Sequence, residues 1–421
     1  MKDIAPSAGI RAQLSEEERT RVRTVIFCHL AGIVLAPVVQ ALWERGVFEL
    51  FDHPSEWVDL EEIVKRMHAN RGYLHVALRL LASHGWLKQR KEVEAANPCY
   101  ALTPEGRIAM AFAPMSYAEA TAFLPKSLFL EDFLFGKSDA PILPSLQYFV
   151  QRAQDRWGIG SAGEPVETKV KEQVRRHLNG ILIGPAMVAL ARGGVLAQLE
   201  RGPAEIRELA GNPASLSCVL DLLATQGWVA REGDHVCLTP SGNYAAQIAT
   251  SYGVTVSYVP LMNVVSVLLF GNPRIPRMDE SGVELLVNRG MNVWGSGGAH
   301  KTYFKKVDEI IVEIFNRPLE NQPQGICDMG CGDGTFLKHL HSVVKTCTLR
   351  GQVLEKHPLI LVGADFNKVA RRVAKQNLRK AEVPECHVIP GDINRPAQLA
   401  SDLEELGLDI HDLLHVRSFL D

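Results

Sequence analysis

The amino-acid sequence predicts an α/β protein: a mainly helical N-terminal part that contains a duplicated winged-helix-like unit, then part of a doubly wound parallel core. Three observations predict this arrangement. They are an internal repeat, a glycine-rich turn between an apolar strand and a helix, and three more apolar strands later in the chain. The 421 residues fit two or three domains, at roughly 150 residues per domain. With 46% apolar residues the chain can bury a core.

The sequence of residues 29–51 recurs at residues 177–199, and the two segments are identical at nine of 23 positions. The similarity continues in order, because 80–86 matches 222–228 and Leu-Thr-Pro recurs at 102 and 238. Such self-similarity indicates an internal duplication.

Each copy predicts three helices, a short hairpin and a final helix, which is the order of a winged helix. Thr103 and Thr239 are expected to cap the final helices, each followed by a proline at the first helical position. The expected recognition helix 71–84 carries only Arg71 and Arg79, and its counterpart 215–226 carries no Lys or Arg. Packing, dimerisation or a substrate lid is therefore favoured over DNA reading.

Charge and composition limit the classes of partner that we expect for this protein. There are 45 Lys and Arg against 48 Asp and Glu, a net charge of -3, so no global basic field favours nucleic acid. The eight cysteines form no Cys-x-x-Cys pair, and the N-terminus does not resemble a secretory signal. We expect a cytoplasmic protein with no nucleic-acid or membrane partner. The most apolar run, 254–270, contains Pro260 and is interpreted as a buried helix.

The predicted domains are a first repeat at 1–110, a helical connector at 111–169, a second repeat with further helices at 170–275, and the core at 276–421.

In the core, a strand at 325–328 leads into a turn with three glycines and a helix that starts near Thr335. Glycine lets the backbone approach a ligand closely. The order Asp-x-Gly-x-Gly-x-Gly differs from the dinucleotide fingerprint. The glycines are Gly330, Gly332 and Gly334.

The other apolar strands each end in an acidic or polar segment. The second ends at Asp365, where nucleotide-binding βαβ units place the acid that binds ribose hydroxyls. The third ends at Asp392 and Ile393, and the fourth comes after Asp412. Strands alternating with helices predict the doubly wound pattern.

Upstream of the glycine turn, residues 293–304 combine small residues with a histidine and a tyrosine. We expect a glycine-serine loop before a helix, whose N–H groups approach a cofactor or substrate. A surface linker is the alternative. The residues assigned to this role are Ser296, Gly297, His300 and Tyr303.

The glycine motif and the segments after it resemble motif I and the corresponding segments of class I S-adenosylmethionine-dependent methyltransferases. The resemblance implies a Rossmann-like core with the duplicated unit as a lid, and S-adenosylmethionine as cofactor. A family core has seven strands, whereas this sequence reaches the fourth, so we expect a further C-terminal segment of the same polypeptide to cover the sheet. The implied cofactor residues, besides those of the loop, are Asp328, Gly330, Gly332, Asp333, Asp365, Phe366, Asp392 and Ile393.

The residues after the fourth strand indicate which kind of chemical group accepts the methyl group. Winged-helix O-methyltransferases usually carry a general-base histidine there, but the alignment on Asp412 places Asp421 at that position. An aspartate is a natural ligand for a metal that stabilises an enolate. His-Val-Arg-Ser-Phe-Leu-Asp, with the two glycine-rich segments, is similar to the C-methyltransferases of polyketide synthase loading modules that carry acetyltransferase-like (GNAT) domains.

That resemblance implies methylation of the α-carbon of a malonyl-type group on an acyl carrier protein, with other polyketide synthase domains as partners and a mononuclear Fe or Mn type metal. The candidate catalytic residues are Asp421, Arg417 and His300, and the candidate metal ligand is Asp421. Arg417 would pair with a substrate carboxylate or form a strand-end ion pair. His415, Cys327 and Cys331 are interpreted as packing residues.

Two other functions stay open at this point. One is an O-methyltransferase of a small natural product. The other is a protein without catalytic activity, either a winged-helix DNA binder or a lid fragment.

Overall fold

The computed structural model describes residues 14–51, 57–90, 97–136, 142–161, 163–274, 284–299, 304 and 307–417. The chain divides into two compact units, Met1–Val287 (unit 1) and Asn288–Asp421 (unit 2), which are described separately. The boundary predicted at 275/276 lies outside the described residues.

The first copy of the repeat begins with a long helix, α1 (Glu16–Glu44). Ser15 caps it, accepting from the Glu18 N–H while the Glu18 carboxylate accepts from the Ser15 N–H. A three-stranded sheet of order β1-β3-β2 forms the wing, with antiparallel pairing throughout. The remaining elements are η1 (Val47–Phe51), β1 (Val58–Asp59), α2 (Leu60–Met67), α3 (Arg71–Ser83), β2 (Leu87–Arg90), β3 (Cys99–Leu102) and α4 (Pro104–Met110).

The second copy repeats this order and begins with the long helix α9 (Pro165–Arg192). Its wing has the equivalent strand order, β4-β6-β5. The Thr103 and Thr239 hydroxyls accept from the N–H groups of Gly106 and Gly242, which confirms both predicted caps. The other elements are α10 (Val195–Arg201), β4 (Ala204–Glu205), η3 (Ile206–Glu208), α11 (Pro213–Ala224), β5 (Val229–Glu232), β6 (His235–Leu238) and α12 (Pro240–Gln247).

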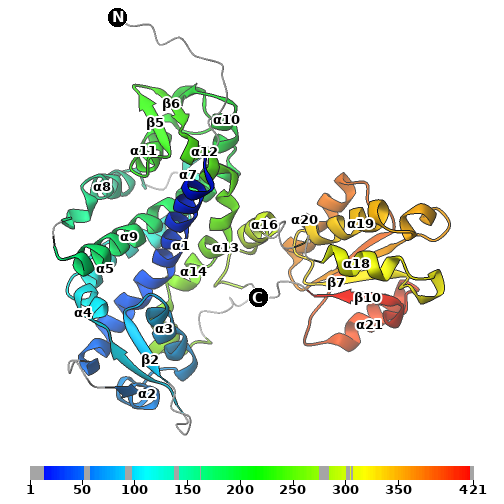
Figure 1. The fold of residues 1–421 in the computed structure, drawn as a ribbon, viewed down its shortest axis with the longest axis horizontal. Coiled ribbons are helices and arrows are strands. Elements are labelled where there is room, and N and C mark those ends of the chain that lie inside the picture. The colour runs from blue at the N-terminus through cyan, green and yellow to red at the C-terminus, as the bar shows by residue number, and fades with distance from the viewer. Residues whose placement is uncertain are drawn as a thin grey trace, which may run out of the picture. The chain divides into compact units, whose positions relative to one another are not determined.

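The two copies pack on each other through α1 and α9, which lie side by side (Figure 1). A Cβ on Gly32 would lie 2.2 Å from the His177 carbonyl oxygen, and a Cβ on Gly180 would lie 2.3 Å from that of His29. The contact is therefore reciprocal: the same repeat position of each copy touches the other. Helix α1 is long and apolar enough to cross a membrane, but 61% of its most apolar stretch is buried within the protein.

A reciprocal pair of polar contacts accompanies this crossing. His29 Nδ1 hydrogen-bonds the Tyr252 hydroxyl at 2.7 Å, and His177 Nδ1 hydrogen-bonds the Tyr117 hydroxyl at 2.7 Å. Both histidines are fully buried. Burial lowers the pKa of each imidazole to about 3, so both are neutral near pH 7.

Short helices complete unit 1. The apolar run predicted as one buried helix at 254–270 is three helices instead, interrupted at Tyr258 and at 263–264. The prediction of a single helix was wrong, and the interruption at Tyr258 is explained by Pro260, which has no N–H to extend the preceding helix. The helices are α5 (Ala113–Thr121), α6 (Leu124–Ser127), α7 (Leu130–Leu134), α8 (Leu143–Gln154), η2 (Arg156–Gly158), η4 (Ala249–Tyr252), α13 (Gly253–Ser257), α14 (Val259–Met262) and α15 (Val265–Phe270).

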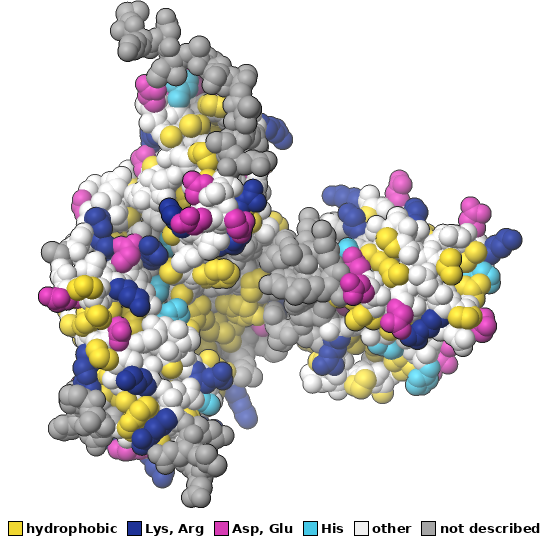
Figure 2. All heavy atoms as spheres, viewed as in Figure 1, with side chains coloured by type: hydrophobic (Ala, Val, Ile, Leu, Met, Phe, Trp, Pro, Cys, Tyr) yellow, Lys and Arg dark blue, Asp and Glu magenta, His cyan; other side chains and the backbone are white. Residues whose placement is uncertain are grey.

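The surface of unit 1 carries both signs of charge. On the face shown in Figure 2, Lys and Arg side chains are interspersed with Asp and Glu. Arg71, at the start of the expected recognition helix of the first copy, is ion-paired with Glu61. Such pairing makes Arg71 less available to a phosphate.

Unit 2 holds a four-stranded sheet of order β10-β7-β8-β9, in which all neighbouring strands are parallel. Helices cover both faces (Figure 1), which is the doubly wound arrangement. The fold class predicted from the sequence is therefore confirmed. The elements are α16 (Arg289–Ala299), α18 (Asp308–Phe315), η5 (Leu319–Asn321), β7 (Gly325–Met329), α19 (Thr335–Cys347), η6 (Arg350–Val353), β8 (Ile360–Asp365), α20 (Lys368–Lys380), β9 (Cys386–Pro390), α21 (Pro396–Glu405), η7 (Ile410–Asp412) and β10 (Leu413–Val416).

Candidate functional site

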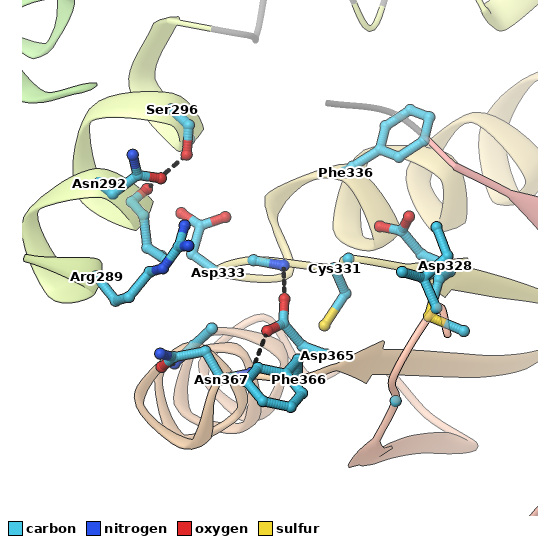
Figure 3. Close-up of a pocket in the computed structure, with 18 of the residues that line it drawn as sticks. Arg289, Asn292, Ser296, Asp328, Cys331, Asp333, Phe336, Asp365, Phe366 and Asn367 are labelled. Carbon is cyan, nitrogen blue, oxygen red and sulfur yellow. Dashed lines mark hydrogen bonds between the residues drawn. The ribbon is translucent and has the colours of Figure 1, made fainter. Parts of the chain in front are cut away.

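A cavity of about 410 Å³ lies at the carboxyl edge of the sheet in unit 2, with α16 along one side (Figure 3). The carboxyl ends of parallel strands are where doubly wound folds bind ligands. Its polar lining residues are Arg289, Asn292, Ser296, Asp328, Asp333, Asp365, Asn367, Asp392 and Asn394.

The glycine turn between β7 and α19 shapes the floor of this cavity. Gly332 has a φ of +54°, a conformation that L side chains rarely adopt. Its N–H donates to Asp365 Oδ2 at 3.0 Å, while the Gly330 N–H donates to the Ala364 carbonyl at 2.7 Å. The turn is thereby held against the end of β8.

Asp365 ends β8 and its carboxylate faces the cavity. Its Oδ1 accepts from the Asn367 N–H at 2.7 Å (Figure 3). Asn367 in turn caps α20, because its side-chain oxygen accepts from the N–H groups of Val369 and Ala370. Each carboxylate oxygen keeps a free lone pair, so Asp365 can also accept hydrogen bonds from ligand hydroxyls.

Two apolar side chains stand beside this carboxylate with unusual exposure. Phe366 is 73% exposed and Ile393 is 43% exposed, and both line the cavity. Asp392 precedes Ile393, and its Oδ1 accepts from the Asn394 N–H at 2.9 Å. The Gly391 N–H donates to the Asp365 carbonyl at 3.1 Å, which holds the two strand ends together. An apolar planar ring would cover the exposed Phe366 and Ile393.

Asp328 is the most deeply buried carboxyl group of the cavity. It is 2% exposed, and its Oδ1 has no hydrogen-bond partner within the described part of the chain. Burial, and secondarily the charge of Asp365, raise the pKa of Asp328 to about 8. A buried polar atom without a partner at the wall of a cavity is the kind of group that a ligand donor satisfies.

Asp333 joins the glycine turn to α16. Its Oδ1 accepts from the Thr335 N–H at 2.9 Å at the start of α19. A Cβ on Gly297 would lie 2.3 Å from Asp333 Oδ2, so a larger residue at this position would require the Asp333 side chain to move. Ser296 and Gly297, which the sequence assigns to cofactor or substrate binding, line the cavity from within helix α16 (Figure 3). The prediction of a loop at these two residues was wrong.

The cavity is acidic. Among its lining residues are four aspartates, and Arg289 is the one Lys or Arg in that lining. Carboxylates at such a site attract cationic ligands and repel anionic ones.

The other predicted residues fall elsewhere. Arg417 is exposed just beyond β10 and does not line the cavity. His415 is exposed as well, with Nε2 at 2.8 Å from the Ile410 carbonyl oxygen, so its assignment to the packed core was wrong. On an edge strand one side chain in two can face water. His300, Tyr303 and Asp421 lie outside the described residues.

Cys327 and Cys331 are both buried, which agrees with their interpretation as packing residues. Burial raises the pKa of the Cys327 thiol to about 12 and that of the Cys331 thiol still further. Neither thiol is therefore a ready nucleophile at neutral pH. Among the described residues, no group of three or more His, Cys, Asp or Glu side chains is arranged to hold a metal ion.

Sequence reasoning missed four polar lining residues. Asn367 carried a usable signal, since an asparagine directly after a strand and before a helical pattern is a typical helix cap. Arg289 and Asn292 gave none, because they belong to a helix whose approach to the sheet is a tertiary contact. The fourth is Asn394.

Three family models match the chain in order. Residues 22–89 match the AprA N-terminal domain, 179–272 match the AprA winged helix domain, and 284–421 match the AprA MT2-like domain, a methyltransferase model. No curated protein matches the chain.

Solved structures with detectable similarity include several methyltransferases. The mitomycin 7-O-methyltransferase MmcR is 16% identical over 55% of this chain and 68% of its own, with a TM-score of 0.35. RosA from Streptomyces davawensis, a dimethyltransferase of an aminoriboflavin, is 18% identical over 52% and 66%, with a TM-score of 0.32. The CurJ carbon methyltransferase is 14% identical over 60% and 64%, with a TM-score of 0.21.

The chain thus spans about two thirds of the length of these structures. With the family model over 284–421 and the parallel sheet at that place, the chain is an enzyme of the methyltransferase class with a class I core.

Proposed function

We propose that this enzyme takes a methyl group from S-adenosylmethionine and transfers it to the α-carbon of a malonyl-type acyl group on an acyl carrier protein, in the biosynthesis of a polyketide starter unit. The cofactor half of this proposal is carried by the acidic cavity. The acceptor half rests on the sequence resemblance to the C-methyltransferases of loading modules.

The charge of the cavity discriminates between adenosine cofactors. S-adenosylmethionine carries a sulfonium, an ammonium and a carboxylate and is a cation overall, whereas a nicotinamide dinucleotide carries a pyrophosphate. Asp328, Asp333, Asp365 and Asp392 surround the space in which the cofactor would lie. Asp328 is largely neutral near pH 7 because its pKa is raised to about 8, and the carboxylates of the other three aspartates favour the cation and disfavour the pyrophosphate.

The residues fit the parts of this cofactor. Asp365 would accept from ribose hydroxyls through its remaining lone pairs. Phe366 and Ile393 would pack on the adenine ring, with the Asp392 carboxylate beside them. Asp328 Oδ1, buried and without a partner among the described residues, would accept from the ammonium group.

When bound, the cofactor supplies a methyl group on a sulfonium, from which an in-line nucleophile displaces the thioether. The chain's own task is to hold donor and acceptor in line, and to assist removal of the acceptor's proton. In the proposed reaction, the α-carbon of a malonyl thioester loses a proton to form an enolate, which is the nucleophile. The new bond joins that carbon to the methyl group, and the proton leaves to a base.

The described lining of the cavity contains no histidine and no lysine. A metal of Fe or Mn type bound through Asp421 remains part of the proposal and rests on the resemblance, since that residue lies outside the described ranges.

The test is intact-protein mass spectrometry of malonyl-loaded carrier protein, incubated with S-adenosylmethionine and the full chain, with and without a chelator. We expect a mass gain of one methylene that is lost in Asp365→Ala and kept in Glu404→Gln, an exposed control on α21. Loss with the chelator supports the metal. Methylation of a small phenol, with the carrier protein unchanged, would contradict C-methylation and support an O-methyltransferase.

A further inference from the structure

A second surface of unit 2 stands out by its charge. Helix α20 carries Lys368, Arg372, Lys375 and Arg379. Their spacing of four, three and four residues places all four on one face of the helix. No acidic residue occurs between 368 and 380. We call these four side chains the basic stripe.

The fold does not use the basic stripe. All four side chains are exposed, and none forms a salt bridge within the described part of the chain. The opposite face of α20 makes the packing contacts, through the buried residues Ala370, Ala374 and Leu378. Four like charges along one helix repel each other, which is unfavourable for stability. A partner of opposite charge would relieve that repulsion.

The stripe borders a groove of about 650 Å³ between α20 and strand β9. Its apolar lining comes from Val369 on the helix and from Val388 and Pro390 on the strand. Strand β9 is an edge of the described sheet, so nothing within that sheet covers this side. The groove thus offers an apolar floor beside a row of cations.

Helix α20 also connects this groove with the cofactor cavity. Asn367 and Ala370, at the start of the helix, line the cavity, whereas Lys368 and Val369 line the groove. A partner bound along the stripe would therefore sit next to the proposed donor site while leaving that site open.

We propose that the basic stripe and its groove are the docking surface for an acidic protein face, that of the carrier protein which presents the acceptor. This inference rests on the proposed function. Surface charges of this kind steer a partner and set its orientation. A protein is favoured over nucleic acid because the floor is aliphatic, without an aromatic side chain on which a base would stack. The net charge of -3 also disfavours nucleic acid as the partner.

The test compares two acceptors with one pair of variants. The double variant Arg372→Glu/Arg379→Glu reverses half of the stripe. Lys338→Glu/Lys345→Glu, on the exposed face of α19, changes the net charge by the same amount and serves as the control. Each enzyme is assayed with malonyl carrier protein and with malonyl-N-acetylcysteamine, a small thioester without phosphate.

We expect the stripe variant to raise KM for the carrier protein about tenfold, the effect of losing a few surface ion pairs, with unchanged rates on the small thioester. The effect should shrink at high salt. The control should behave as the wild type. Equal losses in both double variants, or an unchanged KM in the stripe variant, would overturn the docking surface while leaving the proposed function intact.

A gel shift with duplex and single-stranded DNA tests whether the basic stripe binds nucleic acid instead. Binding that the stripe variant abolishes, together with an unchanged KM for the carrier protein, would assign the stripe to nucleic acid and overturn the proposal. If the wild type methylates a small phenol but neither thioester, the proposed acceptor is wrong, and with it the docking surface.

Discussion

At the scale of single residues, Asp328 determines how the cavity responds to pH. Its carboxyl group is buried at the end of β7 with one oxygen unpartnered among the described residues, and its pKa is raised to about 8. Below that pH the group is neutral and gains little from a ligand ammonium. Above it the carboxylate and the ammonium attract each other in a poorly hydrated site.

We therefore predict that affinity for S-adenosylhomocysteine, which carries the same ammonium, rises as the pH increases through about 8. Asp328→Asn should bind at least about tenfold more weakly at pH 9 and lose most of this dependence. Calorimetric titration between pH 6 and 9 measures both, with Glu404→Gln as the control. An Asp328→Asn variant that retains the wild-type pH profile would exclude Asp328 as the titrating group.

Asp328→Asn should weaken ligand binding but raise the stability of the folded protein. The folded-state pKa of Asp328 is raised above the ordinary value of 3.8, so the folded protein holds a proton that the unfolded chain releases. Stability from this group is therefore lost as the pH rises from about 4 to 8. Asp328→Asn should unfold at a higher temperature than the wild type at pH 8, and the difference should vanish near pH 4.

At the scale of elements, the reciprocal crossing of α1 and α9 holds the duplicated unit together. Gly32→Ala or Gly180→Ala would push a methyl group into the backbone of the facing helix. We predict a loss of about 1–3 kcal/mol in the free energy of unfolding for each, as in an overpacked core. Urea unfolding measures it.

Gly72→Ala is the matched control for this prediction. Gly72 lies in helix α3, and a Cβ there would meet nothing within 4 Å. Alanine should stabilise that helix by up to about 1 kcal/mol. Unfolding energies that are the same for Gly32→Ala and Gly72→Ala would show that the helices do not cross as closely as described.

The buried histidines at this crossing lead to a second prediction, on how stability depends on pH. Both pKa values are about 3, below the ordinary 6.5, so the folded state resists protons that the unfolded chain accepts. Stability should fall as the pH drops below 6.5, by up to about 1.4 kcal/mol per pH unit for each histidine. Unfolding measured from pH 7 to 5 should show a shallower slope in His29→Gln than in the wild type.

The parts of this fold that the sequence predicts are those that depend on neighbouring residues. The strand, glycine turn and helix around Gly332 arise from local propensity, as do the caps at Thr103 and Thr239. The partner of His29 is Tyr252, 223 residues away, and no local pattern indicates it. Gly297 is a similar case: glycine suggested a loop, but the residue lies in helix α16 beside the Asp333 carboxylate, a contact that no local pattern indicates.

At the scale of the whole molecule, the chain consists of two units with separate cores. A ligand that binds only one folded unit stabilises that unit. We predict two transitions in scanning calorimetry, of which S-adenosylhomocysteine raises one by several degrees and leaves the other unchanged. An equal shift of both transitions would mean that the units unfold together.

The identity of the enzyme depends on whether the acidic cavity of unit 2 binds a cationic adenosine cofactor through Asp365. Equilibrium titration of the full chain with S-adenosylmethionine and, separately, with NAD decides this. We expect saturable one-to-one binding of S-adenosylmethionine that Asp365→Ala weakens at least about tenfold, and no binding of NAD. Binding of NAD, or an Asp365→Ala variant with unchanged affinity for S-adenosylmethionine, would contradict the assignment of this cavity.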